Sequence, residues 1–540
     1  MPDFEAERPP GEASGWRGWL MLAALSLFLA IVVRWPLSVQ PSLFPLDGNS
    51  GLHALAIDAA YHGSWSRIPS LLWPEGAPIR LLAVPSLVIG VVFRTLCEPG
   101  TALELTRTVW LAAGGVGVAG LAARLGQGLR GRAVAATLCI VSPITLTEAA
   151  GGRHEQHAYL PIALAVIGAL GAGRASWALG FAGLLLAGFT SPYQLVTAAA
   201  LALTVAAWRG WRPAGATLLA AVLAGIPVSV YYAPAVVAET MFGQPMTATP
   251  AQPALLQLVA PLAGHVSAGA RLASLRTGPI DLAIGACWPP MAVYNIAFLG
   301  WVCLALGLAG GLAGGARIRP LVLGGLLCTL LGLGNELRLS DSGGTGVPLP
   351  WALAQLFPGL RSMQSTGRFL VGATIPLALA AGALAHRWRA TALLAPLALV
   401  EGLFFAPSPW PLPAASIDVA SLRALLPATG PVAVWPAPGL PPSTYALMAL
   451  VGGRPIAGTA TEHFRPVTVA PVGVTPPAPI ASAPAPTGMP VIYVQNQQCA
   501  PLLQWRDRDR LRDRCVGHVC VHLVEVKTTP RPGGPRSAPR

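Results

Sequence analysis

The chain has 540 residues, of which 54% are hydrophobic and only 11% are charged, and the apolar residues come in repeated long blocks. A soluble protein of this length would carry far more surface charge. Its net charge of +13 does not indicate nucleic acid, because the arginines cluster in short connections between the apolar blocks, as the positive-inside rule expects of cytoplasmic loops. Lipid accepts only helices or closed barrels. Since the blocks are continuous and do not alternate, the composition predicts a mainly α, polytopic bundle of membrane helices.

The first apolar block predicts an uncleaved membrane anchor. It follows a cytoplasmic tail, residues 1–16, and it lacks a small-residue cleavage site. The first external loop, residues 36–80, then carries Asp47 beside Gly48 at the membrane edge. A carboxylate there is costly unless it is solvated or paired, so Asp47 is a functional candidate. The alternative is an Asx-turn or a cap for the helix predicted at 50–61.

Two further candidates for binding lie on the helix predicted at 50–61. His53 and Asp58, five residues apart, only partly share a face, whereas Asp58 and His62 share one. The pattern is that of a helix along the membrane surface with one polar side, and an ordinary interfacial helix is the alternative to a binding role. Two full crossings, at 81–97 and 102–124, would leave Arg124 outside, against the charge rule. Either residues 81–97 enter the membrane without crossing it, which we favour, or one span boundary is wrong.

A polar hairpin, residues 151–157, interrupts the later apolar blocks on the expected outer side. Arg153 could pair with a phosphate, while His154 or Glu155 supports a reacting group. His154 and His157 with Glu155 could instead bind a divalent metal, but their spacing matches no established motif, so we assign no metal ligand and no certain cofactor. A solvated hairpin is the structural alternative.

The membrane segments predicted within residues 17–407 number about 11 or 12.

Two arginines before a late span are also candidates. Arg361 and Arg368 lie on the expected outer side, where the charge rule disfavours them. Arginines there suit an anionic ligand such as the phosphate of a lipid carrier. Snorkelling to lipid headgroups is the alternative explanation.

The C-terminal region has a different composition and predicts a small α/β extramembrane domain at 412–527, on the outer side. Short strands are expected at 431–436, 491–494 and 519–526, and a Pro/Ala-rich linker lies at 470–490. The charged run 506–514 predicts a solvated, self-paired helix. Cys499 could bridge Cys515 or Cys520, and we expect a disordered tail at 528–540.

Four features, taken in order, resemble the GT-C class of polytopic membrane glycosyltransferases, specifically its bacterial lipid-phosphate-sugar-dependent type. The likeness covers residues 17–407 and consists of Leu46-Asp47-Gly48, Trp73-Pro74-Glu75-Gly76, Ser142-Pro143 before the polar hairpin, and Pro358-Gly359 with Arg361 and Arg368-Phe369. The resemblance implies a hexosyl- or pentosyl-transferase in the bacterial inner membrane. It would move a sugar from a polyprenyl-phosphate carrier to an envelope glycan or protein acceptor, with inversion.

The same resemblance implies roles for the candidate residues. Asp47 would be the general base that takes the acceptor proton, and Arg153, Arg361 or Arg368 would stabilise the departing lipid phosphate. The chain departs from the class in two ways. The turn at Asp47 has one acid where many members have two adjacent ones, and the hairpin 153–155 stands where a second acid is usual. A lipid-linked-glycan flippase or transporter and a non-catalytic membrane scaffold are the alternatives; an inverted repeat or charges at the bilayer centre would favour transport.

Overall fold

The computed structural model describes most of the first 405 residues and short pieces beyond them. The described ranges are 15–40, 43–45, 50–70, 77–78, 83–157, 159–241, 253–259, 298–340, 343–354 and 366–405, with isolated stretches between 356 and 524. The chain divides into two compact units. The first comprises Met1–Arg67, Pro78–Asp281 and Pro290–Ser416, and the second comprises Ile68–Ala77, Leu282–Pro289 and Ile417–Arg540.

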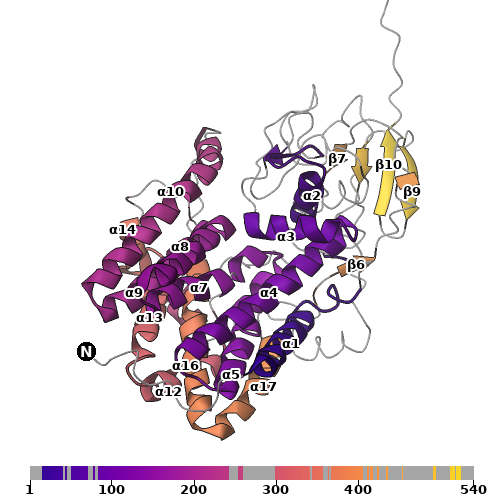
Figure 1. The fold of residues 1–540 in the computed structure, drawn as a ribbon. Coiled ribbons are helices and arrows are strands. Elements are labelled where there is room, and N and C mark those ends of the chain that lie inside the picture. Colours follow the sequence, from indigo (N-terminus) through magenta and orange to yellow (C-terminus); the bar gives the residue numbers. More distant parts are fainter. Residues whose placement is uncertain are drawn as a thin grey trace, which may run out of the picture. The chain divides into compact units, whose positions relative to one another are not determined.

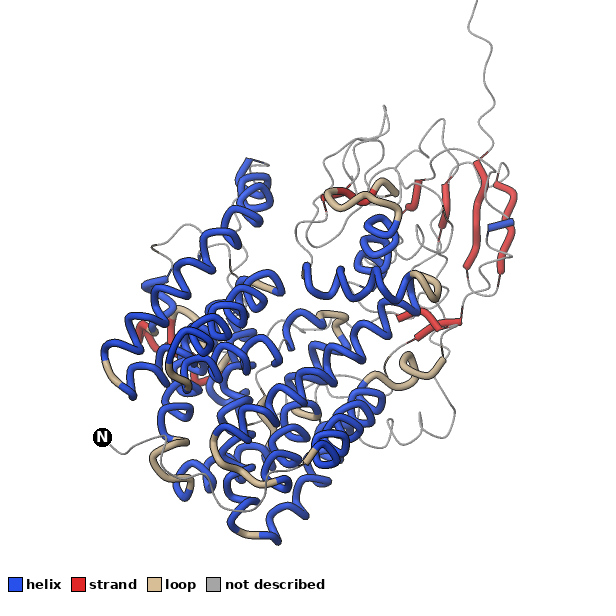
Figure 2. Tube along the Cα trace, viewed as in Figure 1, coloured by secondary structure: helices blue, strands red, loops and turns tan. Residues whose placement is uncertain are grey.

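The first unit is built almost wholly of helices, as the composition predicts (Figure 1, Figure 2). Its first half contains α1 (Trp16–Val33), β1 (Leu43–Pro45), α2 (Ser50–Tyr61), α3 (Val84–Arg94), α4 (Pro99–Arg124), α5 (Leu129–Ile140), α6 (Pro143–Ala150), η2 (His154–His157), α7 (Tyr159–Leu170), α8 (Gly173–Thr190), α9 (Pro192–Arg209) and α10 (Trp211–Met241). Between α2 and α3 in the sequence, β2 (Arg67–Ile68) and β3 (Ala77–Pro78) form a strand pair of two residues each.

The second half of this unit continues the helical pattern and adds one hairpin. It contains η3 (Leu255–Leu258), α12 (Trp301–Ala313), α13 (Arg319–Gly332), β4 (Glu336–Ser340), β5 (Gly343–Pro348), α14 (Pro350–Ala354), η5 (Thr366–Leu370), α16 (Val371–Arg387), η6 (Arg389–Leu394), α17 (Ala395–Phe405) and β6 (Ala414–Ser416). Strand β6 pairs antiparallel with β1, so that Leu43 lies opposite Ser416.

Four helices in the described ranges are long and apolar enough to cross a membrane. They are α1, α4, Trp211–Ala233 within α10, and Thr366–Arg387, and the bent pair α5–α6 makes a fifth if it is one span. The sequence predicts 11 or 12 membrane segments. The difference arises because several expected spans form short helices; α7 has 12 residues, or about 18 Å, against a hydrocarbon core of about 30 Å.

Helix α4 lies at the centre of the first half and positions the residues discussed below. It contacts α1, α5 and α7 along its length and also α2 and α3 (Figure 1). Its Leu111, Val118 and Leu121 are fully buried in the main core cluster. Small residues bring neighbouring helices together, as is usual in membranes: a Cβ on Gly168 of α7 would lie 2.4 Å from Cα of Gly180 in α8.

The two elements after the first span differ in how well the sequence predicts them. Helix α2 has the predicted bounds, but ten of its 12 residues are buried, because α3 and α4 cover it. The prediction of a surface helix with one polar side is therefore wrong. Helix α3 has 11 residues, about 16 Å, which is too short to cross and agrees with entry without crossing.

The described strands of the second unit form two pairs. Strand β7 (Ala433–Trp435) runs parallel to β8 (Val491–Tyr493), and β9 (Leu511–Val516) runs antiparallel to β10 (Val519–Val524), with Cys515 opposite Cys520. The three predicted strands are thus confirmed. The helix predicted for 506–514 is wrong from Leu511 onward, because backbone pairing with β10 replaces pairing of charges along a helix. Cys499, the linker and the tail lie outside the described residues.

Candidate functional site

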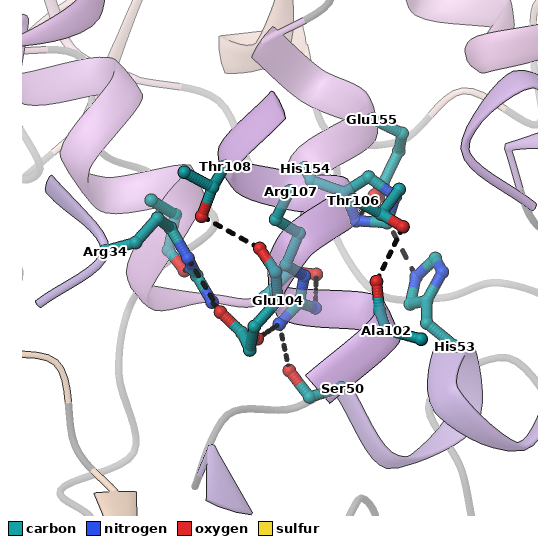
Figure 3. A network of polar contacts seen from close by, with 12 residues as sticks. Arg34, Ser50, His53, Ala102, Glu104, Thr106, Arg107, Thr108, His154 and Glu155 are labelled. Carbon is teal, nitrogen blue, oxygen red and sulfur yellow. Dashed lines mark hydrogen bonds and ion pairs between the residues drawn. The ribbon is translucent and has the colours of Figure 1, made fainter. Parts of the chain in front are cut away.

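A buried group of charged side chains lies where the end of α1 meets the start of α4 (Figure 3). Glu104 of α4 accepts hydrogen bonds from Nε of Arg34 at 3.1 Å and from Nη1 of Arg107 at 2.8 Å. The side chains of Arg34, Glu104 and Arg107 are 2%, 6% and 0% exposed. Buried charges are costly unless they are paired and hydrogen-bonded, so ionisable groups inside a membrane bundle mark a functional site by default.

The two arginines also hold three separate pieces of backbone and side chain together. Nη1 of Arg34 donates to the carbonyl oxygen of Ala149 at 2.6 Å, and Nη2 of Arg107 donates to that of Gly152 at 2.6 Å. Nη1 of Arg107 donates to the hydroxyl of Ser50, the first residue of α2. The Arg34–Glu104–Arg107 group therefore fixes the turn after α6 and the start of α2 relative to α4.

The polar hairpin predicted at 151–157 is a buried turn and not a solvated one. Helix α6 before it begins with Pro143 and is capped by Ser142, whose hydroxyl accepts from the backbone N–H of Thr145 at 3.2 Å. Gly152 then adopts φ +71°, a conformation that favours glycine. Nε of Arg153 lies 2.8 Å from Oε2 of Glu148, an ion pair without hydrogen-bond geometry, and both residues are buried.

Three side chains from α2 and η2 meet beside this turn (Figure 3). Oε2 of Glu155 lies 3.9 Å from Nε2 of His53 and 3.7 Å from Nδ1 of His154. The two imidazole rings are in edge contact, 4.7 Å between centroids. Their three ligand atoms lie within 4.8 Å of one another. His53, His154 and Glu155 form what we call the histidine–glutamate group.

Burial and charge set the protonation of this hairpin. Burial, reinforced by the charges of His53 and Arg107, holds the pKa of His154 well below its usual range. Burial and the nearby arginines lower the pKa of His157 to about 3. Burial raises the pKa of Glu155, and the positive charge of Arg368 opposes that rise. Both histidines are therefore neutral at pH 7 and can act as acceptors or ligands.

The start of α9 connects Arg368 to the same hairpin. Cζ of Arg368 lies 5.1 Å from the centroid of the Tyr193 ring, a cation–π contact. The neighbouring Gln194 donates from Nε2 to the carbonyl oxygen of Gln156 in η2 at 2.8 Å. The positive charge of Arg368 therefore lies close enough to oppose the rise in the pKa of Glu155.

The structure thus brings together four of the residues predicted from sequence, with a fifth, Arg368, close by: His53, Arg153, His154 and Glu155. Asp58 is separate, because its Oδ1 accepts from Nε of Arg94 in α3 at 2.8 Å. It also lies 3.7 Å from His62, as the i, i+4 spacing predicts. Asp47 and Arg361 lie outside the described residues.

Sequence reasoning did not select Arg34, Glu104, Arg107 or Glu148. The sequence does contain a signal for two of them. Glu104 and Arg107 stand three residues apart, where they can share a face, in a helix whose other charged residue, Arg124, is its last. The pairing of Arg34 with Glu104 spans 70 positions and has no local signal in the sequence.

Comparison with known proteins gives a structural likeness. No protein-family model matches the chain, and no curated protein matches it either. Among solved structures, the chain is similar to the oligosaccharyltransferase of Archaeoglobus fulgidus in its apo form, with 14% sequence identity and a TM-score of 0.43. The match covers 83% of this chain and spans 65% of the length of that structure.

Proposed function

We propose that this chain is a membrane glycosyltransferase that moves a sugar from a polyprenyl-phosphate carrier to an acceptor at the outer face of the bacterial inner membrane. The observation that carries the proposal is the anchoring of the chain on both sides of Asp47. On one side, β1 is paired with β6; on the other, Arg107 holds Ser50. The Arg34–Glu104–Arg107 group thus fixes Ser50, three residues after the proposed base, and a general base depends on fixed neighbours.

The candidate residues take different roles in this proposal. Asp47 is the base that removes the acceptor proton, and attack opposite the leaving group inverts the anomeric carbon. Arg368, half-buried over Tyr193, and Arg361 bind the phosphate of the carrier as it departs. Arg153 lies beside Glu148, so we propose that it stabilises the hairpin. His53 acts as part of the histidine–glutamate group. Asp58, paired with Arg94, is assigned to support of α2.

The histidine–glutamate group also has the donor set of a divalent-cation site. Two imidazoles and a carboxylate are ligands that Zn²⁺ accepts. In the described part of the chain, both ring nitrogens of His154 and Oε2 of Glu155 are buried without a hydrogen-bond partner. A bound cation would satisfy Oε2 of Glu155 and one ring nitrogen of His154, and it would supply positive charge beside the phosphate of the carrier.

The test is sugar transfer by the purified chain in liposomes that contain a polyprenyl-phosphate sugar labelled in the sugar. Asp47→Asn should reduce transfer by at least about 100-fold, the usual range for loss of a general base. Asp58→Asn is the matched control, since it removes an acid from the same loop and should leave most activity.

Two results would replace this proposal. If Asp47→Asn transfers sugar at the rate of the parent chain, Asp47 is not the base. If the parent chain moves the labelled carrier between leaflets without transferring its sugar, the chain is a flippase. Glu104 and Arg107 lie in the first three turns of a 26-residue helix and not at its centre, so their position does not favour transport.

A further inference from the structure

A cavity lies at the opposite end of α7 from η2, between the α7–α8 and α9–α10 helix pairs. Its volume is about 240 Å³. Most of its lining is alanine and glycine, and its polar groups come from Ser176, Arg209, Arg212 and Thr217. It contains none of the residues assigned above to sugar transfer. By the arginine pattern of the sequence, this end of the bundle faces the cytoplasm.

The cavity carries two positive charges on its wall. Nη1 of Arg209 donates to the carbonyl oxygens of Ala169 and Gly171, each at 2.6 Å, which holds its guanidinium in place. Arg212 is exposed, and its Cζ lies 5.3 Å from the centroid of the Trp211 ring. No carboxylate is found among the described residues that line the cavity. The wall is thus suited to an anion, which guanidinium groups bind through paired hydrogen bonds.

The surroundings of the cavity are those of a membrane boundary. Trp177 is part of its lining, and Trp208 and Trp211 each directly precede one of the two arginines in sequence; all three are exposed. Exposed tryptophans beside arginines are typical of the headgroup level. From here α10 exposes an apolar surface that includes Leu218, Leu219, Val222 and Ile226. Only 17% of the part of α10 that could cross a membrane is buried among the described residues, which suits contact with lipid.

The size of the cavity limits what it holds. Sites that enclose drug-sized ligands have about 300–1,000 Å³, so 240 Å³ admits a small anionic head and leaves any longer part outside. The apolar surface of α10 begins where that longer part would emerge. The charge, size and surroundings of the cavity therefore all indicate an amphiphilic ligand with an anionic head.

We propose that this cavity binds the headgroup of an anionic phospholipid, with its phosphate at Arg209 and Arg212 and its acyl chains along the exposed side of α10. Basic pockets between membrane helices on the cytoplasmic side are known to accept such headgroups. The site is independent of the proposed sugar transfer, and it stands whether or not Asp47 is a base.

The experiment is native mass spectrometry of the full chain in detergent, titrated with phosphatidylglycerol and, separately, with phosphatidylcholine. The parent chain should retain phosphatidylglycerol preferentially. Arg212→Gln should weaken its binding about fivefold, the effect of one basic residue at an anionic membrane surface. Ala216→Phe places a ring at an exposed lining position and should block binding. Arg174→Gln is the matched control, since Arg174 is exposed at the start of α8 but does not line the cavity.

Thermal unfolding of the same variants is the second readout, because a lipid that binds only the folded chain raises its unfolding temperature. Phosphatidylglycerol should stabilise the parent and Arg174→Gln chains and should stabilise Arg212→Gln and Ala216→Phe less. Equal binding of the two lipids by the parent chain would overturn the proposal, as would full binding by both Arg212→Gln and Ala216→Phe. Displacement of phosphatidylglycerol by millimolar inorganic phosphate would overturn it in favour of a soluble phosphate ligand.

Discussion

The two ends of the helical bundle differ in how far their arginines are buried and in whether a carboxylate pairs with them. At the end that contains η2, Arg34 and Arg107 are buried and share the carboxylate of Glu104, and Arg153 lies beside Glu148. At the other end, Arg209 and Arg387 are half-buried or exposed and donate to backbone carbonyl oxygens. The first pattern keeps charge inside the protein, whereas the second leaves charge at the surface.

This difference shows which charges carry information about function. Desolvating an arginine is costly, so a buried pair persists only where something requires it. Surface arginines at helix ends follow the orientation of the chain in the membrane and contribute little to stability individually. The buried end is therefore the better candidate for chemistry, and the exposed end is the better candidate for contact with lipid headgroups.

The largest effect is expected from Glu104→Gln, which removes the carboxylate shared by Arg34 and Arg107. Breaking a buried ion pair from one side typically lowers stability by about 3–5 kcal/mol. We expect a loss of this size in the unfolding free energy of the chain in detergent. Glu98→Gln is the control, because Glu98 is exposed just before the start of the same helix. Equal losses from both substitutions would show that burial does not set the cost of losing a carboxylate at this end of the bundle.

A smaller effect is expected from His154→Ala, which tests the histidine–glutamate group. The chain, stripped with a chelator, should bind one Zn²⁺, and the substitution should weaken binding by at least about tenfold because it removes one ligand of a small set. Calorimetric titration measures the affinity. His62→Ala is the control, because His62 directly follows the helix that carries His53 and is exposed; its loss should leave the affinity unchanged. Zinc affinity that is insensitive to His154 would remove the cation from the proposed site.

How far the sequence predicts the structure depends on whether a feature is local. The bounds of α2, the short α3 and strand β10 follow from residues within a few positions of one another. The burial of α2 does not, because α4 covers it from more than 35 positions away in the chain. Likewise, the separation of His53 from Asp58 follows from their helical spacing, but their partners, Glu155 and Arg94, are set by packing.

The same distinction explains the errors. The charged run 506–514 has good helical pairing of opposite charges, yet part of it forms β9 because β10 provides a partner strand. The hairpin 151–157 is polar enough to be solvated, yet Arg34 and Arg107 bond to its backbone and its neighbour. In both cases, a distant partner outweighs a local preference.

A still smaller effect is expected from Asp58→Asn, which breaks an ion pair on α2 that is partly exposed. Oδ1 of Asp58 is 2.8 Å from Nε of Arg94, with side-chain exposures of 31% and 19%. Pairs in such surroundings are typically worth about 0–1 kcal/mol, so the unfolding free energy should fall by no more than that. A loss of unfolding free energy as large as that from Glu104→Gln would mean that the Asp58–Arg94 pair is as important to stability as the Arg34–Glu104–Arg107 group.

The last prediction concerns Cys97, whose labelling tests the path of α3. Of the cysteines that the structure describes, Cys139, Cys303 and Cys328 are buried and Cys97 is partly accessible. If α3 enters without crossing, an impermeant maleimide should label Cys97 from outside the cell in a variant that retains only this cysteine. Labelling only after permeabilisation would mean that α3 crosses.

The rate of this labelling should also depend on pH in a defined direction. Burial raises the pKa of the Cys97 thiol, Arg94 opposes the rise and Glu98 adds to it. Because the thiolate reacts, labelling should be slower than that of a free thiol at pH 7 and should accelerate as pH rises past 9. Glu98→Gln should speed labelling at a given pH, and Arg94→Gln should slow it. The opposite signs separate a local charge effect from a change in the accessibility of the turn, which would alter both rates in the same direction.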